Sequence, residues 1–169
     1  LRCIVQHVRL LFQQADVDAT VELTAYTGIA AFNIGFGAKT CCSSFSIAGT
    51  GAWKKEVKGD AAKRLEQQWR SVVLLIVDEI SFIGTSSFAR MHFRLQQGRS
   101  RYFSERGLNP SGYTFGDASV ILVGDFGQLE PIDDVSLVDQ ETTRETLHKN
   151  LRHLMNHIRH GRYLLREFK

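Results

Sequence analysis

Two apolar stretches that each run into acidic residues constrain the fold of this 169-residue chain more than any other feature. Residues 72–77 (VVLLIV) and 119–123 (SVILV) are β-branched and aliphatic, with almost no polar alternation. Strands of this composition are typical of a parallel sheet that is covered by helices on both faces. Ligands of such sheets bind beyond the carboxyl ends of the strands. The two stretches therefore predict an α/β fold with a ligand site just after residues 77 and 123.

The residues that follow the two stretches are suited to nucleotide hydrolysis. Asp78 and Glu79 follow the first, and Asp125 and Gln128 follow the second. One carboxylate can hold Mg²⁺ through water while another polarises an attacking water, and a neutral amide can contact a terminal phosphate without adding repulsion. We therefore expect these side chains to meet at one sheet edge. The alternative for the acidic pair is that it only stabilises the start of the next helix.

Composition indicates a single globular domain, because 43% of the residues are hydrophobic and only two are proline. The formal charge of +3 does not by itself indicate a nucleic-acid partner. Cys3, Cys41 and Cys42 form neither a CxxC pair nor a disulfide framework, which favours a reducing intracellular compartment. The longest apolar run is too short to span a membrane, and the first residues do not resemble a secretory signal. We expect no membrane association.

Periodicity and turn signals predict alternating helices and strands. Helices are expected at 3–14, 29–34, 54–70, 86–97 and about 142–160, strands at 21–26, 72–77 and 119–123, and loops at 35–37, 44–51 and 98–116. A helix between two parallel strands is the expected crossover connection.

A phosphate-binding loop, with Gly-Lys-Ser/Thr at the start of a helix, is absent from the sequence. The nearest string, GFGAKT at 35–40, has an alanine between glycine and lysine and follows the second predicted helix. We interpret it as an ordinary loop. The chain also opens inside its first predicted helix without a capping residue. We therefore expect the start of the domain, including the phosphate loop, to be missing.

Four strings occur in the order and approximate spacing of the petite-integration-frequency DNA helicases: LTAYTGIAAFNIG, KTCCSSFSI, LLIVDEIS and VILVGDFGQLEPI. The chain resembles this family over most of 23–132. The resemblance implies an ATP-dependent, five-prime-to-three-prime DNA helicase of superfamily one with a RecA-like P-loop nucleotide hydrolase core. It further implies an incomplete first motor domain at 1–133, followed at 134–169 by an insertion and a helical segment that leads toward a second motor domain.

The resemblance assigns the nucleotide site. It implies that Asp78 holds Mg²⁺ through water, that Glu79 is the catalytic carboxylate, and that Gln128 senses the terminal phosphate of ATP, with Asp125 in the same sensor segment.

The resemblance also assigns a DNA contact to Thr24, Thr27 and Gly28. A threonine hydroxyl and backbone amides at a helix start can hold a DNA phosphate, although an ordinary helix cap would have the same sequence. The implied partners are single-stranded DNA or DNA junctions. We expect a monomer in the nucleus, with the mitochondrion as the alternative, that acts in DNA repair, recombination and telomere maintenance.

Three residues depart from the family pattern: Tyr26 replaces a small residue or proline, Cys42 replaces histidine and Glu130 replaces proline. Glu130 adds negative charge to a segment that would face phosphate. These departures and the missing loop favour an alternative, a non-catalytic remnant that binds nucleic acid or a partner. A RecD-like or transposon-borne helicase is a third interpretation.

Histidines in the last predicted helix are candidate metal ligands, because His153 and His157 have i,i+4 spacing and His160 follows. Arg152 and Arg159 lie beside them. We therefore interpret this helix as having a solvated basic face, which could also contact a nucleic-acid backbone.

Overall fold

Four parallel strands form one sheet in the order β2-β1-β3-β4 in the computed structural model, which describes residues 1–47, 56–139 and 155–168. The strands are β1 (Thr20–Ala25), β2 (Lys39–Thr40), β3 (Val72–Asp78) and β4 (Ser119–Leu122). The predicted α/β class with a parallel sheet is confirmed. The two acid-ended strands, β3 and β4, pair directly and so lie side by side.

Strand β3 is buried on both faces, which explains its lack of polar alternation. Leu75 and Val77 belong to one hydrophobic cluster, whereas Leu74 and Ile76 belong to the other. Successive side chains of a strand point to opposite faces, so an apolar residue is needed at nearly every position.

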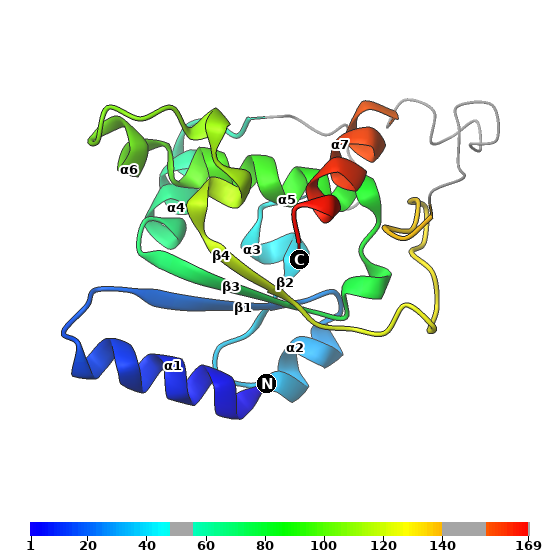
Figure 1. The fold of residues 1–169 in the computed structure, drawn as a ribbon, viewed down its shortest axis with the longest axis horizontal. Coiled ribbons are helices and arrows are strands. Elements are labelled where there is room, and N and C mark those ends of the chain that lie inside the picture. Colours follow the sequence, from blue (N-terminus) through cyan, green and yellow to red (C-terminus); the bar gives the residue numbers. More distant parts are fainter. Residues whose placement is uncertain (48–55, 140–154, 169) are drawn as a thin grey trace.

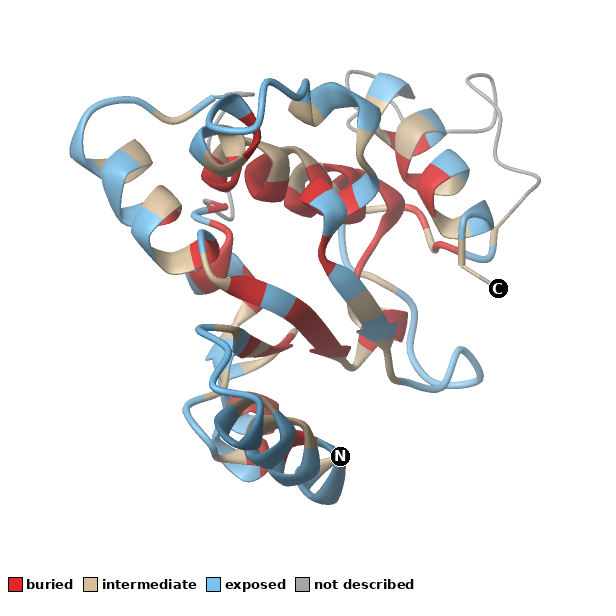
Figure 2. Cartoon of the chain, turned by 60° about the vertical axis from the view of Figure 1, so that its left-hand side comes forward, coloured by how far each residue is buried: buried red, intermediate tan, exposed pale blue. Residues whose placement is uncertain are grey.

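Helices cover both faces of the sheet (Figure 1). The helices α1 (Arg2–Gln14) and α2 (Gly28–Ile34) lie on one face, and α4 (Asp60–Trp69), α5 (Thr85–Gly98) and α7 (Met155–Arg166) lie on the other. Figure 2 shows that the buried residues gather on the central strands β1 and β3 and on the helix surfaces that face them, whereas the residues of the edge strand β4 are exposed or half-buried. The short helix α3 (Cys41–Ser44) leads to Phe45, whose ring stacks on Trp69 with centroids 4.8 Å apart.

Residues 98–116 are more ordered than the predicted loop. They contain the helix α6 (Ser100–Ser104) and the 3-10 turns η2 (Pro110–Gly112) and η3 (Thr114–Asp117). Phe103 is fully buried, and Phe115 is 1% exposed. Two aromatic anchors thus fix a segment whose remaining residues are mostly polar, and such isolated anchors give no helical period.

Two predicted helices have different limits in the structure. The helix expected at 54–70 begins at Asp60. Gly59, directly before it, has a φ of 61°, which is not a helical conformation, so the helix cannot extend further toward the N-terminus. The last helix runs to Arg166 instead of ending near 160, while 140–154 lie outside the described residues.

The predicted division after residue 133 does not separate two hydrophobic cores. Leu137 and Leu164 belong to the same cluster as Leu75 and Phe88 of β3 and α5. Where the structure describes 134–169, this segment therefore packs as part of the same body.

All three cysteines are free thiols, and burial raises the pKa of Cys41 to about 12. In the described ranges, no helix is both long and apolar enough to cross a bilayer.

The face of α7 predicted to be solvated instead packs against α5 at His160. The His160 ring stacks on Phe93, with centroids 4.8 Å apart and an interplanar angle of 9°, and lies 5.0 Å from the ring of His92. Arg159 is exposed as expected, and His153 lies outside the described residues. Within the described part of the chain, no group of three His, Cys, Asp or Glu residues could hold a metal ion.

We predict that the His92 ring makes stability depend on pH. Its Nδ1 accepts a hydrogen bond from the Phe115 amide at 2.9 Å, and burial and then His160 lower its pKa from 6.5 to about 4. The unfolded chain binds this proton more readily, so stability falls as the pH drops from about 6.5 toward 4. Between pH 7 and pH 4.5 the free energy of unfolding should lose on the order of 2 kcal/mol through His92.

Urea unfolding of the wild type and of His92→Asn at both pH values measures this contribution. Asparagine keeps an acceptor but does not titrate, so the variant should lose less stability than the wild type. An equal loss in the two proteins would contradict the assignment.

Candidate functional site

The carboxyl ends of three neighbouring strands meet at one edge of the sheet. Ala25 of β1 pairs with Asp78 of β3, and Val77 of β3 pairs with Leu122 of β4. Backbone bonds continue beyond the last paired residues, because the Val123 amide donates to the Val77 carbonyl at 2.8 Å and the Ile80 amide donates to the Val123 carbonyl at 3.0 Å. The segments that carry the two predicted acidic groups are therefore held together by main chain.

Asp78 and Glu79 form the turn by which the chain leaves the sheet. Asp78 is partly buried, and its Oδ1 accepts a hydrogen bond from the Glu79 amide at 3.0 Å. Glu79 has φ 56° and ψ 42°, a left-handed conformation that costs about 1–2 kcal/mol for a residue with a Cβ. The 3-10 helix η1 (Ile80–Phe82) follows at once and turns the chain toward α5. Strain of this kind at a sheet edge is typical of functional sites.

Thr27 joins the end of β1 to this turn. Its hydroxyl donates to Glu79 Oε2 at 3.2 Å and accepts from the Ala30 amide at 3.1 Å, which caps α2. The structure thus brings together a residue predicted to contact DNA and the predicted catalytic carboxylate, although 52 positions separate them in the sequence.

The other two predicted DNA contacts differ in accessibility. Thr24 is 1% exposed, and its hydroxyl donates to the Ile76 carbonyl inside the sheet at 3.3 Å. Gly28 is exposed, and a Cβ added to it would meet nothing within 4 Å. A ligand can therefore approach Gly28 and not the side chain of Thr24, whose DNA contact stays a prediction.

Asp125 and Gln128 lie in an exposed turn that follows β4. Asp125 Oδ1 accepts from the Gly127 amide at 2.8 Å, and the Gln128 amide donates to the Asp125 carbonyl at 3.2 Å. In the part of the chain that the structure describes, no hydrogen bond joins this turn to the side chains of Asp78 or Glu79. The four residues share the sheet edge, as two pairs on neighbouring segments.

Tyr26 has a structural role at this edge that sequence reasoning missed. Its ring stacks on Phe82 of η1, with centroids 5.8 Å apart and an interplanar angle of 14°. Burial, together with the nearby Cys42 and Asp134, raises the pKa of its phenol. An aromatic residue directly before the capping residue Thr27 is not expected from the family pattern, whereas the stack explains it directly. The signal in the sequence was the aromatic residue three positions after Glu79.

The glycine-containing string at 35–40, interpreted from the sequence as an ordinary loop, ends in the two residues of the edge strand β2. Lys39 lies in the edge strand β2, and its Nζ is 3.1 Å from Glu22 Oε1. The same oxygen accepts from Ser44 Oγ at 2.7 Å and from Gln68 Nε2 at 2.8 Å. Lys39 is therefore engaged in a polar network on the sheet.

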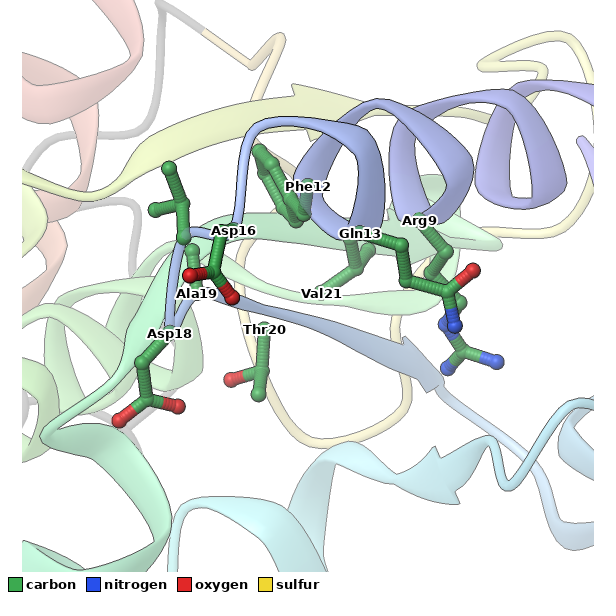
Figure 3. A pocket seen from close by; sticks show the side chains of 9 residues that line it. Arg9, Phe12, Gln13, Asp16, Asp18, Ala19, Thr20 and Val21 are labelled. Carbon is green, nitrogen blue, oxygen red and sulfur yellow. The ribbon is translucent and has the colours of Figure 1, made fainter.

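An open cavity of about 730 Å³ lies at the opposite end of β1 (Figure 3). Phe12 and Asp16 line it on the side of α1, and Thr20 and Val21 line it at the start of the strand. Because the strand runs away from this cavity toward Ala25, the cavity is separate from the candidate site.

Known proteins match this arrangement. The family model for PIF1-like helicases matches residues 4–153. The chain belongs to the PIF1-like helicase family. The ATP-dependent DNA helicase PIF1 of Xenopus laevis is 32% identical over 115 residues, which are 67% of this chain and 16% of the relative. The chain thus spans 16% of the length of this curated relative.

Solved Pif1 structures confirm the RecA-like fold. The Pif1 helicase from Candida albicans has a TM-score of 0.58 and 27% identity, over 88% of this chain and 31% of that one. Bacteroides Pif1 bound to single-stranded DNA has a TM-score of 0.51 and 20% identity, over 97% of this chain and 30% of that one, which shows a likeness of fold alone.

Gly124 allows the two acid-bearing segments to approach, and we predict that Gly124→Ala destabilises the protein. A Cβ at this position would lie 2.9 Å from the Ile80 amide nitrogen and 3.0 Å from Ile80 Cγ2. The backbone and side-chain shifts that the added Cβ forces should lower the free energy of unfolding by about 1–3 kcal/mol. Urea unfolding measures it, with Gly112→Ala as the control because a Cβ there meets nothing within 4 Å. Equal stabilities of the two variants would contradict the packing argument.

Proposed function

We propose that the protein hydrolyses ATP and uses it to unwind DNA in the five-prime-to-three-prime direction. Family membership and the name of the Xenopus relative, an ATP-dependent DNA helicase, support the proposal. The observation that carries it is the hydrogen bond of 3.2 Å between Thr27 and Glu79, which connects the segment assigned to DNA with the carboxylate assigned to hydrolysis.

Asp78 fits the coordination that Mg²⁺ prefers. Its carboxylate lies at a strand end, with Oδ1 accepting one amide and capacity left for water. Mg²⁺ usually keeps several waters and binds through one or two carboxylates and the phosphates of the substrate, so a single carboxylate at a strand end would be enough to hold it through water. When bound, Mg²⁺ would offset negative charge on the phosphates of ATP.

In the proposed mechanism, Glu79 accepts a proton from the attacking water as the water oxygen bonds to the terminal phosphorus and the bond to the bridging oxygen breaks. Gln128 contacts the terminal phosphate with a neutral amide, and Asp125 holds the turn that carries Gln128. The exposure of this turn leaves Gln128 free to respond to loss of the phosphate.

For the DNA partner, we propose single-stranded DNA or a DNA junction at Thr27 and Gly28. Bacteroides Pif1 is bound to single-stranded DNA in one solved structure, and the open space around Gly28 in this chain permits close approach of a backbone. The resemblance further leads us to propose a monomer that acts in the nucleus, or alternatively the mitochondrion, in repair, recombination and telomere maintenance.

The alternative is that the isolated 169-residue chain binds nucleic acid or a partner without turnover. It contains no Gly-Lys-Ser/Thr loop, and its nearest lysine, Lys39, is paired with Glu22. We therefore propose that these 169 residues alone do not hydrolyse ATP, because turnover needs a phosphate-binding loop in addition to the acidic pair.

We predict that Glu79→Gln in the full-length protein lowers the kcat for ATP by about 10²–10⁴-fold, because glutamine keeps the shape and cannot accept the proton. Steady-state hydrolysis with single-stranded DNA measures it. Glu105→Gln, which removes one carboxylate near Ser71 at the opposite end of β3, should leave kcat unchanged. Unchanged turnover in Glu79→Gln would reject this carboxylate as the base.

The isolated 169-residue chain provides a separate test. If this chain hydrolyses ATP and Glu79→Gln abolishes the hydrolysis, the non-catalytic alternative is rejected.

A second prediction concerns coupling through Thr27. Valine at this position has nearly the same volume but can neither donate to Glu79 nor cap α2, whereas serine can do both. We expect Thr27→Val to reduce the stimulation of hydrolysis by DNA by about tenfold or more, because misplacing a catalytic group is costly. Thr27→Ser should retain most of it. Equal stimulation in the wild type and the valine variant would show that the bond has no part in coupling.

A further inference from the structure

Asp134, six residues after Gln128, is hydrogen-bonded to the first turn of α5. Its Oδ1 accepts from the Ser86 amide at 3.2 Å, and its Oδ2 accepts from Ser86 Oγ at 2.6 Å, from the Ser87 amide at 3.0 Å and from Ser87 Oγ at 3.0 Å. These bonds satisfy amides that have no partner within the helix, and the negative charge is favourable at a helix start. The sequence alone assigned this residue to an inserted loop.

Main-chain contacts strengthen the attachment. The Thr85 amide donates to the Val135 carbonyl at 2.8 Å, and Gly84 forms an antiparallel bridge with Ser136. A Cβ on Gly84 would lie 2.1 Å from Asp134 Cγ, so the carboxylate lies directly against the backbone before α5.

The attachment holds the far end of the loop after β4 to the same segment that holds its near end. At one end, Val123 is bonded to Val77 and Ile80, and at the other end Asp134 is bonded to Ser86 and Ser87. Both anchors therefore lie on 77–87, the segment that carries Asp78 and Glu79. Residues 124–130 between the anchors are exposed, and Leu129 and Ile132 are 74% and 76% exposed. Little packing holds the loop, so its ends determine where it lies.

We propose that Asp134 is a positioning residue for Gln128, which fixes the distal end of the 124–133 loop relative to the acidic pair. This inference rests on the proposed role of Gln128 in contacting the terminal phosphate. Loss of the Asp134 side chain would leave the distal end of the loop held only by the main-chain contacts of Val135 and Ser136, so this end would move more, and Gln128 would then leave its working position for part of the time.

Backbone order parameters of the chain, measured by NMR relaxation, test the attachment without any activity. In Asp134→Ala, the order parameters of the 124–133 amides should fall below about 0.6, which is the flexible range. The order parameters of the β3 amides should keep their wild-type values. Asp133→Asn is the matched control, because Asp133 is an exposed acid in the same loop and the described structure gives it no side-chain hydrogen bond. The double variant Ser86→Ala/Ser87→Ala removes two partners of Asp134 and keeps its charge. It should loosen the loop in the same direction and serves as the test should Asp134→Ala fail to fold.

An unchanged order parameter at Gln128 in both Asp134→Ala and Ser86→Ala/Ser87→Ala would show that Asp134 only caps α5, and it would overturn the proposal. A loop that is already in the flexible range in the wild type would overturn it equally.

Hydrolysis by the full-length protein provides the second measurement. Asp134→Ala should lower kcat by about tenfold or more with the KM for ATP within about twofold, because a misplaced sensor affects the reaction more than ground-state binding. Asp133→Asn should retain kcat. Normal kcat in Asp134→Ala would overturn the positioning role alone. Absence of hydrolysis in the wild type would instead reject the proposed function, and the order parameters would still decide whether Asp134 holds the loop.

Discussion

The burial of β3 on both faces means that the polar groups at its carboxyl end are satisfied by neighbouring chain rather than by water. The Val77 carbonyl and the Ile80 amide both bond to Val123, and Gly124 is small enough to lie against Ile80. Unpaired backbone groups in such a place are costly, so these bonds fix the two strand exits against each other. The left-handed backbone of Glu79 follows from the same constraint, because the chain must leave a fully paired strand within one residue.

Two side chains from other segments, Thr27 and Asp134, then hold the groups on either side of this turn in place. Thr27 holds the carboxylate of Glu79 from the side of β1, and Asp134 holds the start of α5 from the side of the loop after β4. Each uses a short polar side chain at a helix start, where unpaired amides are available. The rigid sheet edge is in this way connected to two accessible segments, at Gly28 and at Gln128, which are free to meet ligands.

Local sequence pattern predicts the parts of this arrangement that depend on local physics. The apolar runs of β3 and β4 and the acids after them indicate the sheet and its functional edge. Burial on two faces explains the lack of polar alternation only in β3, because β4 is an edge strand whose residues are exposed or half-buried. The pattern cannot indicate that Thr24 faces inward, that Phe103 and Phe115 anchor a polar segment, or that His160 packs on Phe93. Those outcomes depend on contacts between distant segments. Asp134 is the clearest case, since its partners lie 47 and 48 positions away.

The charge of the site bears on how a nucleotide could bind. Asp78, Glu79, Asp125 and Glu130 all lie on the segments that leave β3 and β4 at one edge. A polyphosphate approaching them meets like charges, whose repulsion is strong where water is partly excluded. Lys39 is held by Glu22 on the sheet and does not offset this charge. Under the proposed function, nucleotide binding at this edge would need positive charge from Mg²⁺ or from cationic groups other than Lys39, so we expect the affinity for ATP to depend on the divalent cation more steeply than the affinity for DNA does.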